Sequence, residues 1–390
     1  MEQRKSCTHR NFYITIILCI ILSAPVYFFR ITKPVDSDYG GHVASAEYFL
    51  DNGYFEPAAA THPILKLLMI VITKTTGGFL GLYASLFLLQ IVAQGMIGGI
   101  VYYWIGSQPD RKLESWRIFA SVSVTFIAPF MIYALKDGLF YYGYIGMANY
   151  HNPTIHLLKP IALGGLILAE KGLNHPKNNT RTIILSAILV VISAGIKPNF
   201  VMSFIPALGL VCLCLLLSKK EFDIKMNILG FAVPSILVLS LQYMILYGNE
   251  SANIKIIWAP FVVGLAFSSH LFLKFLLSSL FVIQGLLVFW RSLISDRILF
   301  LGWVMFLIGI FQNYFLAESG SATMHGNFGW SGQIVLFLLT VIILRKSFQT
   351  LAKQNSNDIK AIIPGLLTYL LQLVGGIAYY FYCLTSVHYR

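Results

Sequence analysis

Long apolar stretches recur along the whole chain and are separated by short polar segments. They begin at Phe12 and continue to the C-terminus, and the runs 226–246 and 361–384 contain no acidic residue. Each of these runs is long enough for an α-helix to cross about 30 Å of hydrocarbon, whereas a transmembrane barrel would show short segments of alternating polarity. The pattern therefore predicts an all-α fold, a polytopic bundle of transmembrane helices.

The order of the apolar runs predicts where single helices lie. The first run, 12–29, follows basic residues as a signal peptide would, but no small-residue cleavage site follows it, so we interpret it as an uncleaved helix. The segment 63–106 divides at the turn-like KTTGG of 74–78. By length we expect about 11 to 13 crossings. The remaining predicted crossings are 118–135, 156–170, 182–198, 200–218, 226–246, 271–290, 298–316, 331–345 and 361–384.

Charge gives the bundle a direction. The net charge is +12, and 18 of the 28 Lys and Arg residues fall in six clusters between apolar runs. This arrangement is typical of cytoplasmic loops under the positive-inside rule, so topology explains the basic excess and we expect no nucleic-acid partner. It predicts a cytoplasmic N-terminus. The clusters are Arg4, Lys5 and Arg10; Arg111, Lys112 and Arg117; Lys171, Lys177 and Arg181; Lys219, Lys220 and Lys225; Arg291 and Arg297; and Arg345, Lys346, Lys353 and Lys360.

If the clusters face the cytoplasm, 63–106 must cross the membrane an odd number of times. Either its first part is re-entrant or the cluster at Arg111 is an exception to the rule. The chain, 1–390, then forms one integral-membrane domain. Its informative outer segments are 30–62, 136–156, 247–270 and 317–330.

The first outer segment is the most unusual, with five of the 16 acidic residues of the chain. Its stretch HVASAEYFLDNGYF combines a mixed apolar face with a helix-stopping Asn52-Gly53. This pattern predicts a short amphipathic helix lying along the outer membrane surface. The acids are Asp36, Asp38, Glu47, Asp51 and Glu56, and the apolar face is Val43, Ala46, Tyr48, Phe49 and Leu50.

Asp36 and Asp38 stand two residues apart, with His42 close behind. Paired carboxylates at this spacing can hold a hard divalent cation such as Mg²⁺ or Mn²⁺, or one of them can act as general base toward a hydroxyl. The alternative is that both acids are simply solvated in an exposed loop.

Two further outer segments carry candidate ligand-binding groups. In the second outer segment, hydrogen-bond donors and a lysine stand where the chain re-enters the membrane as a helix. These groups suit a diphosphate or sugar hydroxyls. The alternative is that Asn-Pro-Thr is an ordinary helix start. In the segment 317–330, small residues would let the backbone approach a ligand closely, and an aromatic ring could stack on a sugar face. The alternative is that this segment is a flexible loop with one interfacial Trp. The candidates are His151, Asn152, Thr154, His156 and Lys159, then Glu318, His325, Asn327 and Trp330.

Lys159 and Lys197 both stand directly before a proline at an outer helix end. A cation there either snorkels to the interface or meets an anion, such as a lipid phosphate.

These residues resemble the C-type glycosyltransferase superfamily. The similarity consists of the acidic pair just after the first membrane helix, a surface helix ending in Asn-Gly, and Thr61-His62-Pro63 opening the next helix. It covers about the first 110 residues. The chain differs from better-known branches, because it has no large soluble C-terminal domain and no WWDYG-like motif.

The resemblance implies a polytopic enzyme that takes sugar from an isoprenoid-phosphate-linked donor. An acidic residue of the first outer loop would be general base or metal ligand, a role that maps onto Asp36 and Asp38. The acceptor would be a hydroxyl of a glycan, lipid or protein, and direct displacement would invert the anomeric centre. We expect a role in cell-surface polysaccharide or glycolipid synthesis at a bacterial inner membrane.

Two other functions stay open from the sequence. One is a transporter or flippase for a polar lipid or small anion, although no inverted repeat is visible and few acids lie in mid-helix. The other is a noncatalytic assembly protein of polysaccharide export, which would tolerate loss of the acidic pair.

Overall fold

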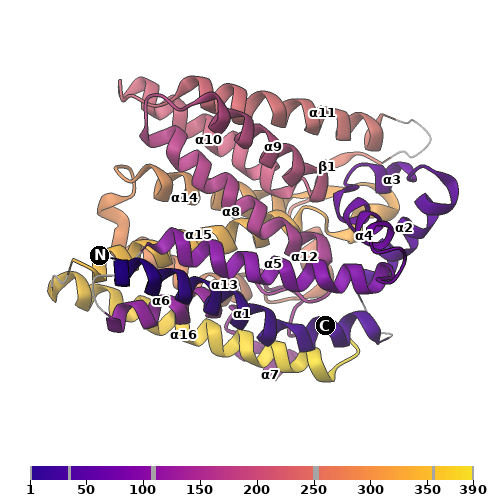
Figure 1. Ribbon diagram of the computed structural model, residues 1–390, viewed down its shortest axis with the longest axis horizontal. Coiled ribbons are helices and arrows are strands. Elements are labelled where there is room, and N and C mark those ends of the chain that lie inside the picture. Colours follow the sequence, from indigo (N-terminus) through magenta and orange to yellow (C-terminus); the bar gives the residue numbers. More distant parts are fainter. Residues whose placement is uncertain (1, 34–36, 107–110, 249–253, 354–355, 389–390) are drawn as a thin grey trace.

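The structure is a computed structural model that describes residues 2–33, 37–106, 111–248, 254–353 and 356–388. It is 78% helical, and long helices run along its longest axis (Figure 1). Eight helices in the described ranges are long and apolar enough to cross a membrane. The predicted all-α polytopic bundle is confirmed.

The long helices agree with the predicted apolar runs to within a few residues at most ends. Two of them are unusual. The run 226–246 begins with a π-helical stretch, η2. The 22-residue α8 carries charged side chains within its length. The long helices are α1 (Glu2–Thr32), α5 (Leu82–Ile105), α8 (Pro153–Asn174), α9 (Thr180–Ile196), α10 (Asn199–Leu217), η2 (Met226–Ala232) with α11 (Val233–Tyr247), α13 (Leu271–Phe289), α14 (Arg297–Phe315), α15 (Gly329–Leu351) and α16 (Ser356–Thr385).

Short elements connect these helices. They are α2 (Tyr39–Asn52), α3 (Pro57–Ala60), α4 (Ile64–Thr75), α6 (Arg111–Ser123), η1 (Met131–Tyr133), α7 (Ala134–Asp137), β1 (Ile256–Trp258), α12 (Val262–Phe267), η4 (Trp290–Ser292), β2 (Leu316–Glu318) and η5 (Gly320–His325). β1 and β2 pair antiparallel, with Ile256 opposite Glu318, so the third and fourth outer segments join in a two-stranded ribbon.

In the segment 63–106, one helix is long and apolar enough to cross a membrane. The first part, α4, has 12 residues. At about 1.5 Å per residue it is only about 18 Å long and cannot span about 30 Å of hydrocarbon. Gly77 and Gly78 have positive φ angles and turn the chain into α5, which is long enough to cross. A single crossing satisfies the odd parity that the basic clusters require.

The predicted helix at 118–135 is wrong as one continuous helix. α6 ends at Ser123, and residues 124–130 are irregular up to η1. Pro129 disfavours helical geometry at the residue before it. The freed backbone groups are satisfied by other helices: Ala128 N donates to Gln372 O at 3.3 Å, and Phe130 N donates to Leu277 O at 3.2 Å. Fewer residues of this region therefore form a regular crossing than the apolar pattern predicts.

The helix after the acidic pair is present as α2. It ends at Asn52, and Gly53 adopts a left-handed conformation with its N–H bonded to Phe49 O. Val43 and Ala46 of the predicted apolar face are buried, whereas Leu50 is exposed. The helix and its stop signal are confirmed, but its inner face begins earlier, at buried Tyr39.

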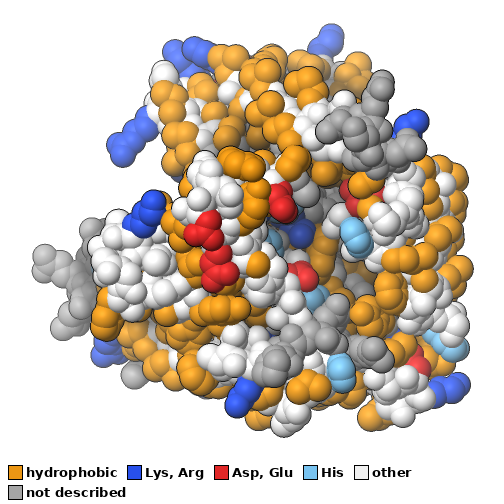
Figure 2. Space-filling model, turned by 90° about the vertical axis from the view of Figure 1, so that its right-hand side faces the viewer, with side chains coloured by type: hydrophobic (Ala, Val, Ile, Leu, Met, Phe, Trp, Pro, Cys, Tyr) orange, Lys and Arg blue, Asp and Glu red, His pale blue; other side chains and the backbone are white. Residues whose placement is uncertain are grey.

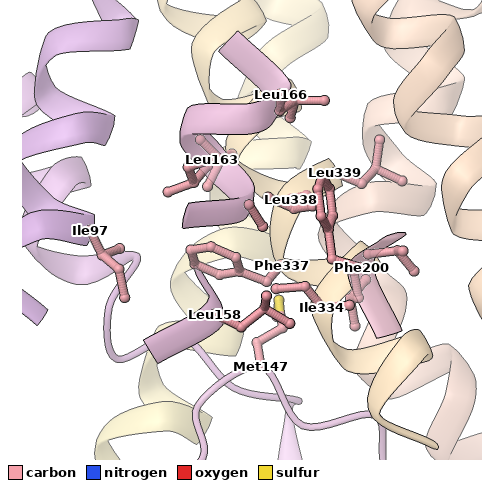
Figure 3. Packing of buried hydrophobic residues seen from close by; sticks show 14 of the residues in the cluster. Ile97, Met147, Leu158, Leu163, Leu166, Phe200, Ile334, Phe337, Leu338 and Leu339 are labelled. Carbon is pink, nitrogen blue, oxygen red and sulfur yellow. The ribbon is translucent and has the colours of Figure 1, made fainter. Parts of the chain in front are cut away.

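The core of the bundle is built around α15, which is buried along most of its length. Side chains of α5, α8 and α10 converge on it (Figure 3). Phe337 and Ile334 of α15 lie close to Leu158 of α8 and Met147 of the preceding loop. Because these helices are held on several sides, the loops at their ends are fixed relative to one another.

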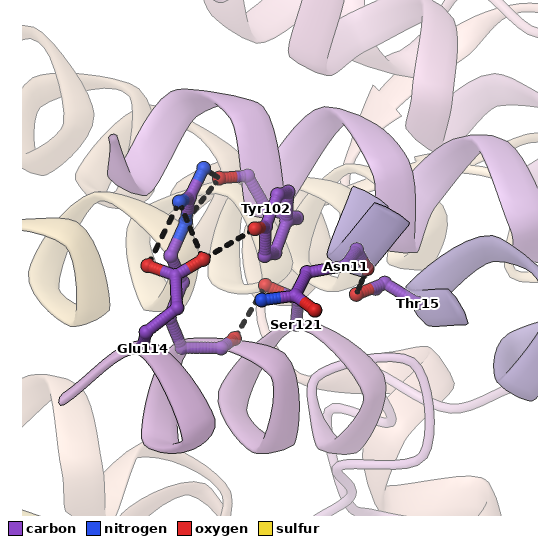
Figure 4. Close-up of polar contacts among 6 residues, drawn as sticks. Asn11, Thr15, Tyr102, Glu114 and Ser121 are labelled. Carbon is purple, nitrogen blue, oxygen red and sulfur yellow. Dashed lines mark hydrogen bonds and ion pairs between the residues drawn. The ribbon is translucent and has the colours of Figure 1, made fainter. Parts of the chain in front are cut away.

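The helix ends that carry the basic clusters meet at one end of the bundle. Arg345 of α15 pairs with Glu170 of α8 at 2.6 Å, and Arg297 Nη1 of α14 donates to Leu173 O. Figure 4 shows a further network there, in which α1, α5 and α6 meet through Asn11, Tyr102 and Glu114. The four predicted outer segments leave the opposite helix ends, beside α2, α3 and β1 in Figure 1.

Candidate functional site

Asp38 stands directly before α2 and is held by the second outer segment. Its backbone N–H donates to His151 O at 2.9 Å, and its carboxylate accepts a hydrogen bond from Asn152 Nδ2. The neighbouring Tyr39 hydroxyl donates to Tyr150 O at 3.0 Å. The Asp38 side chain does not cap its own helix. Two segments more than a hundred residues apart thus fix the position of this carboxylate.

A directional chain of hydrogen bonds leads from Asp38 to Lys197. Lys197 Nζ donates to Thr154 Oγ1 at 3.3 Å, and Thr154 Oγ1 donates to Asn152 Oδ1 at 2.7 Å. Asn152 Nδ2 in turn donates to Asp38. The amide therefore connects the candidate base with a cation, which also lies over the Trp330 ring at 4.7 Å from its centroid.

Lys197 opens onto a recess of about 260 Å³, which we name the lysine recess. Its polar groups come from four separate parts of the chain, and its remaining wall is apolar, mostly from α11, with Met202 of α10. Figure 2 shows a hollow on this face in which acidic, basic and histidine side chains lie within a largely hydrophobic surround. The polar lining residues include His62, Lys197, Asn199, Gln242, Glu318 and Asn327.

Glu318 lines this recess, but its carboxylate is engaged by protein donors. Tyr247 Oη donates to Oε1 at 2.7 Å, and Asn327 Nδ2 donates to Oε2 at 2.6 Å. Asn327 is held in turn, because its carbonyl accepts from Asn199 Nδ2 at 2.8 Å. These bonds shape the wall of the recess.

A second recess, of about 190 Å³, lies beyond His151 and Trp330. We name it the aromatic recess, because tyrosines of the second outer segment and Phe267 contribute to its lining. His151 meets the Tyr141 ring edge-on at 4.6 Å between centroids, and Trp330 lies 5.9 Å from His151. His325 also lines this recess. Trp330 in turn contacts Lys197, and we name His151 and Trp330 the partition, because they lie between the aromatic recess and that cation.

The protein environment shifts the pKa values of Asp38 and Lys197. Asp38 keeps an exposed surface, yet removal of water by the surrounding protein raises its pKa above the ordinary 3.8, against the lowering effects of Lys197 and Asn152. Burial lowers the pKa of Lys197 to about 8, although Asp38 opposes this shift. These shifts make the Asp38 carboxylate more basic than an ordinary aspartate, while Lys197 stays mostly protonated at pH 7.

Three of the candidate site histidines, His42, His62 and His151, are neutral at pH 7. Burial, with the nearby charges of Lys66 and Lys197, lowers the pKa of His42 and of His62 to about 3. Burial, with Arg30 and Lys197, has the same effect on His151. These imidazoles can donate or accept hydrogen bonds but do not add positive charge.

His156 and Lys159 lie inside the bundle, and neither is among the described lining residues of the two recesses. His156 Nδ1 is bonded to the Tyr27 hydroxyl at 3.0 Å. Lys159 Nζ donates to Met147 O at 2.6 Å and lies 5.1 Å from the centre of the Phe337 ring. Lys159 thus holds the loop before α8. Of the two lysines before proline, the structure brings only Lys197 to a recess.

Other residues of the site lacked a distinct sequence signal. Asn199 lies two positions after Lys197 in the GIKPNF stretch, so its neighbourhood was marked. Gln242 donates to Thr61 O and, at 2.9 Å, to Ala194 O, yet it looks like an ordinary polar residue in an apolar helix. Tyr314 belongs to an apolar run and reaches a recess only through the packing of α14.

Of the two carboxylates predicted to bind a metal ion, the structure describes only Asp38. Asp36 lies outside the described residues, so its distance from Asp38 is untested. Within the described ranges, no group of three or more His, Cys, Asp or Glu side chains could hold a metal ion. A divalent cation at Asp36 and Asp38 stays a prediction.

No protein-family model matches the chain, and no curated protein is similar to it at a significant level.

Proposed function

We propose that the protein is a membrane glycosyltransferase that moves a sugar from an isoprenoid-phosphate-linked donor to a hydroxyl acceptor. The observation that carries this proposal is the hydrogen-bond chain from Asp38 through Asn152 and Thr154 to Lys197. It couples a basic carboxylate to a cation that lines a recess with apolar walls. A phosphate head beside Lys197 and an isoprenoid tail along α10 and α11 would match this division of polarity.

In the proposed reaction Asp38 is the general base. Its carboxylate takes the proton of the acceptor hydroxyl while the hydroxyl oxygen bonds to the anomeric carbon. The bond from that carbon to the phosphate oxygen breaks, and the electron pair leaves with the phosphate. Lys197 would stabilise the charge that develops on this oxygen. A single displacement of this kind inverts the anomeric centre.

A cation at the acidic pair would assist the leaving phosphate. Asp38 supplies hard oxygen ligands of the kind that Mg²⁺ and Mn²⁺ prefer, and Asp36 would supply the others. In this reaction Asp38 would still take the proton and Lys197 would still hold the phosphate.

The recesses would face the outside of a bacterial inner membrane. The basic clusters gather at the opposite end of the bundle, which is the pattern of a cytoplasmic surface. With the N-terminus in the cytoplasm, the enzyme would act in cell-surface polysaccharide or glycolipid synthesis.

The test is sugar transfer by the purified protein in lipid nanodiscs with a panel of polyprenyl-phosphate and polyprenyl-diphosphate sugars. We expect Asp38→Asn to reduce transfer about 100- to 10,000-fold, the usual contribution of a general base. Asp51→Asn, which changes an exposed acid near the other end of α2, is the matched control and should transfer normally. The variant Asp36→Asn tests the partner carboxylate in the same assay.

Normal transfer by Asp38→Asn would exclude the catalytic role of this residue. If the wild-type protein transfers no sugar from any donor of the panel, transport or a noncatalytic assembly role becomes the better explanation.

A further inference from the structure

The aromatic recess differs chemically from the lysine recess. Its described lining residues include no Lys, Arg, Asp or Glu, whereas Lys197 and Glu318 line the lysine recess. Its polar groups come from tyrosines, histidines and the amides of Asn313 and Gln333. The nearby buried Lys274 is paired with Asp137 at 2.6 Å. A charged head group would find no counter-charge in this lining, and a hydrocarbon chain would cover these polar groups without satisfying them.

Two of the lining tyrosines, Tyr144 and Tyr314, have a buried hydroxyl that makes no hydrogen bond within the described residues. Tyr314 is 9% exposed, and within the described residues its hydroxyl has no hydrogen-bond partner. A buried hydroxyl without a partner is costly, so an unpaired one in the wall of a cavity points to a ligand that completes it. Gln333 Nε2, in contrast, donates to Tyr141 Oη at 2.7 Å and fixes the opposite wall.

Size and surface narrow the class of ligand. A space of about 190 Å³ is far larger than the about 10 to 15 Å³ that one water needs, so the recess can hold a molecule as large as a sugar ring. Aromatic faces combined with neutral donors and acceptors suit a ring that has apolar C–H faces and hydroxyl edges.

The recess also lies next to the candidate base. His151 forms part of its wall, and the carbonyl of His151 accepts the backbone N–H of Asp38 at 2.9 Å. Trp330 contacts both His151 and Lys197, so the partition lies between the aromatic recess and the cation.

We infer that the aromatic recess is a subsite for a neutral saccharide, which enters the reaction as the acceptor. Its role as acceptor subsite rests on the proposed function, whereas its capacity to bind a saccharide does not. Tyr314 donates to a saccharide oxygen, and the partition keeps the acceptor apart from the donor phosphate until its hydroxyl meets Asp38.

The experiment measures binding without any donor. Full-length protein in nanodiscs is titrated with the methyl glycosides of glucose, galactose, mannose, rhamnose and N-acetylglucosamine, and binding is followed by saturation-transfer NMR. We expect at least one glycoside to bind, and Tyr314→Phe to weaken it about five- to tenfold, the effect of one lost hydrogen bond. Tyr247→Phe removes a hydroxyl from the lysine recess instead and should leave the affinity unchanged.

Absence of binding across the panel, or equal weakening by both tyrosine variants, overturns the subsite. These outcomes are separate from the fate of the proposed function. Saccharide binding that depends on Tyr314 in a protein without transferase activity would keep the subsite and refute the glycosyltransferase. Sugar transfer without such binding would support the glycosyltransferase and refute the subsite.

Discussion

At the scale of single residues, the site depends on one amide. Asn152 accepts the Ile155 N–H at the start of α8, accepts the Thr154 hydroxyl, and donates to Asp38. It therefore serves as a helix cap and as the link between the candidate base and Lys197. The two roles can be separated, because α9 begins with the same kind of cap at Asn179, whose Oδ1 accepts the Thr182 N–H at 2.8 Å.

Asn152→Ala and Asn179→Ala should destabilise the protein similarly, each by about 1 kcal/mol, because each removes one N-cap. Only Asn152→Ala should also reduce sugar transfer, by about ten- to a hundredfold, because it removes a hydrogen bond to a charged group. Thermal unfolding and initial transfer rates of the two variants provide the measurement. Equal activity in both would mean that Asn152 is only a cap.

The pH dependence of transfer follows from two pKa shifts. Protonation removes the base, and because the pKa of Asp38 lies above 3.8, activity should already fall at a less acidic pH than for an ordinary aspartate. Lys197 loses its charge as the pH rises through about 8, so activity should fall again there.

The alkaline limb is tested with Lys197→Arg, because an arginine stays protonated far above pH 8. The pH profile of kcat/KM should lose its decline near pH 8 in this variant and keep its acidic limb. A decline that persists unchanged would assign it to another group.

At the scale of helices, small residues decide where elements approach most closely. The Gly375-Gly376 pair of α16 faces the irregular segment 124–130. A β-carbon on Gly376 would lie 1.9 Å from Phe126 O, and one on Gly375 would lie 2.2 Å from Pro129 O. The glycines allow α16 to approach this backbone closely, and Gln372 one turn earlier accepts from it, so the break in the helix is stabilised by its neighbour.

Gly376→Ala should therefore destabilise the bundle, by about 1 to 3 kcal/mol, since the clash is with backbone that cannot rotate away. Gly209→Ala in α10 is the control, because no atom lies within 4 Å of its β-carbon position. Melting temperatures in one detergent compare the two. A Gly376→Ala protein as stable as the control would show that this segment can move aside.

At the scale of the whole molecule, charge divides the bundle into two ends. The basic helix ends meet on one side, and residues of the outer segments at the other side line both recesses, so we expect ligands to enter from the side opposite the basic clusters. This separation ties the proposed chemistry to the orientation of the chain in its membrane.

Thiol labelling of intact cells can test the orientation. In a cysteine-free background, Asp51→Cys should react with a membrane-impermeant reagent, whereas Lys220→Cys should react only after the cells are lysed. Both positions are exposed in the structure, so accessibility within the protein is matched. The opposite pattern would place the recesses on the cytoplasmic side.

The sequence by itself determined the all-α bundle, most helix positions, the basic end, and α2 with its stop at Gly53. The length of apolar runs, the charge clusters and the capping residues are local properties of the sequence. They are enough to predict helices because a membrane-spanning segment must be long, apolar and hydrogen-bonded within itself. The sequence also marked Asp38, Asn152, Lys197 and Trp330 as candidates. Only the tertiary structure decided that these four belong to one site and that Lys159 serves the core instead. Contacts between distant segments depend on how helices pack, so the unpaired hydroxyl of Tyr314 has meaning only once the neighbouring segments are in place.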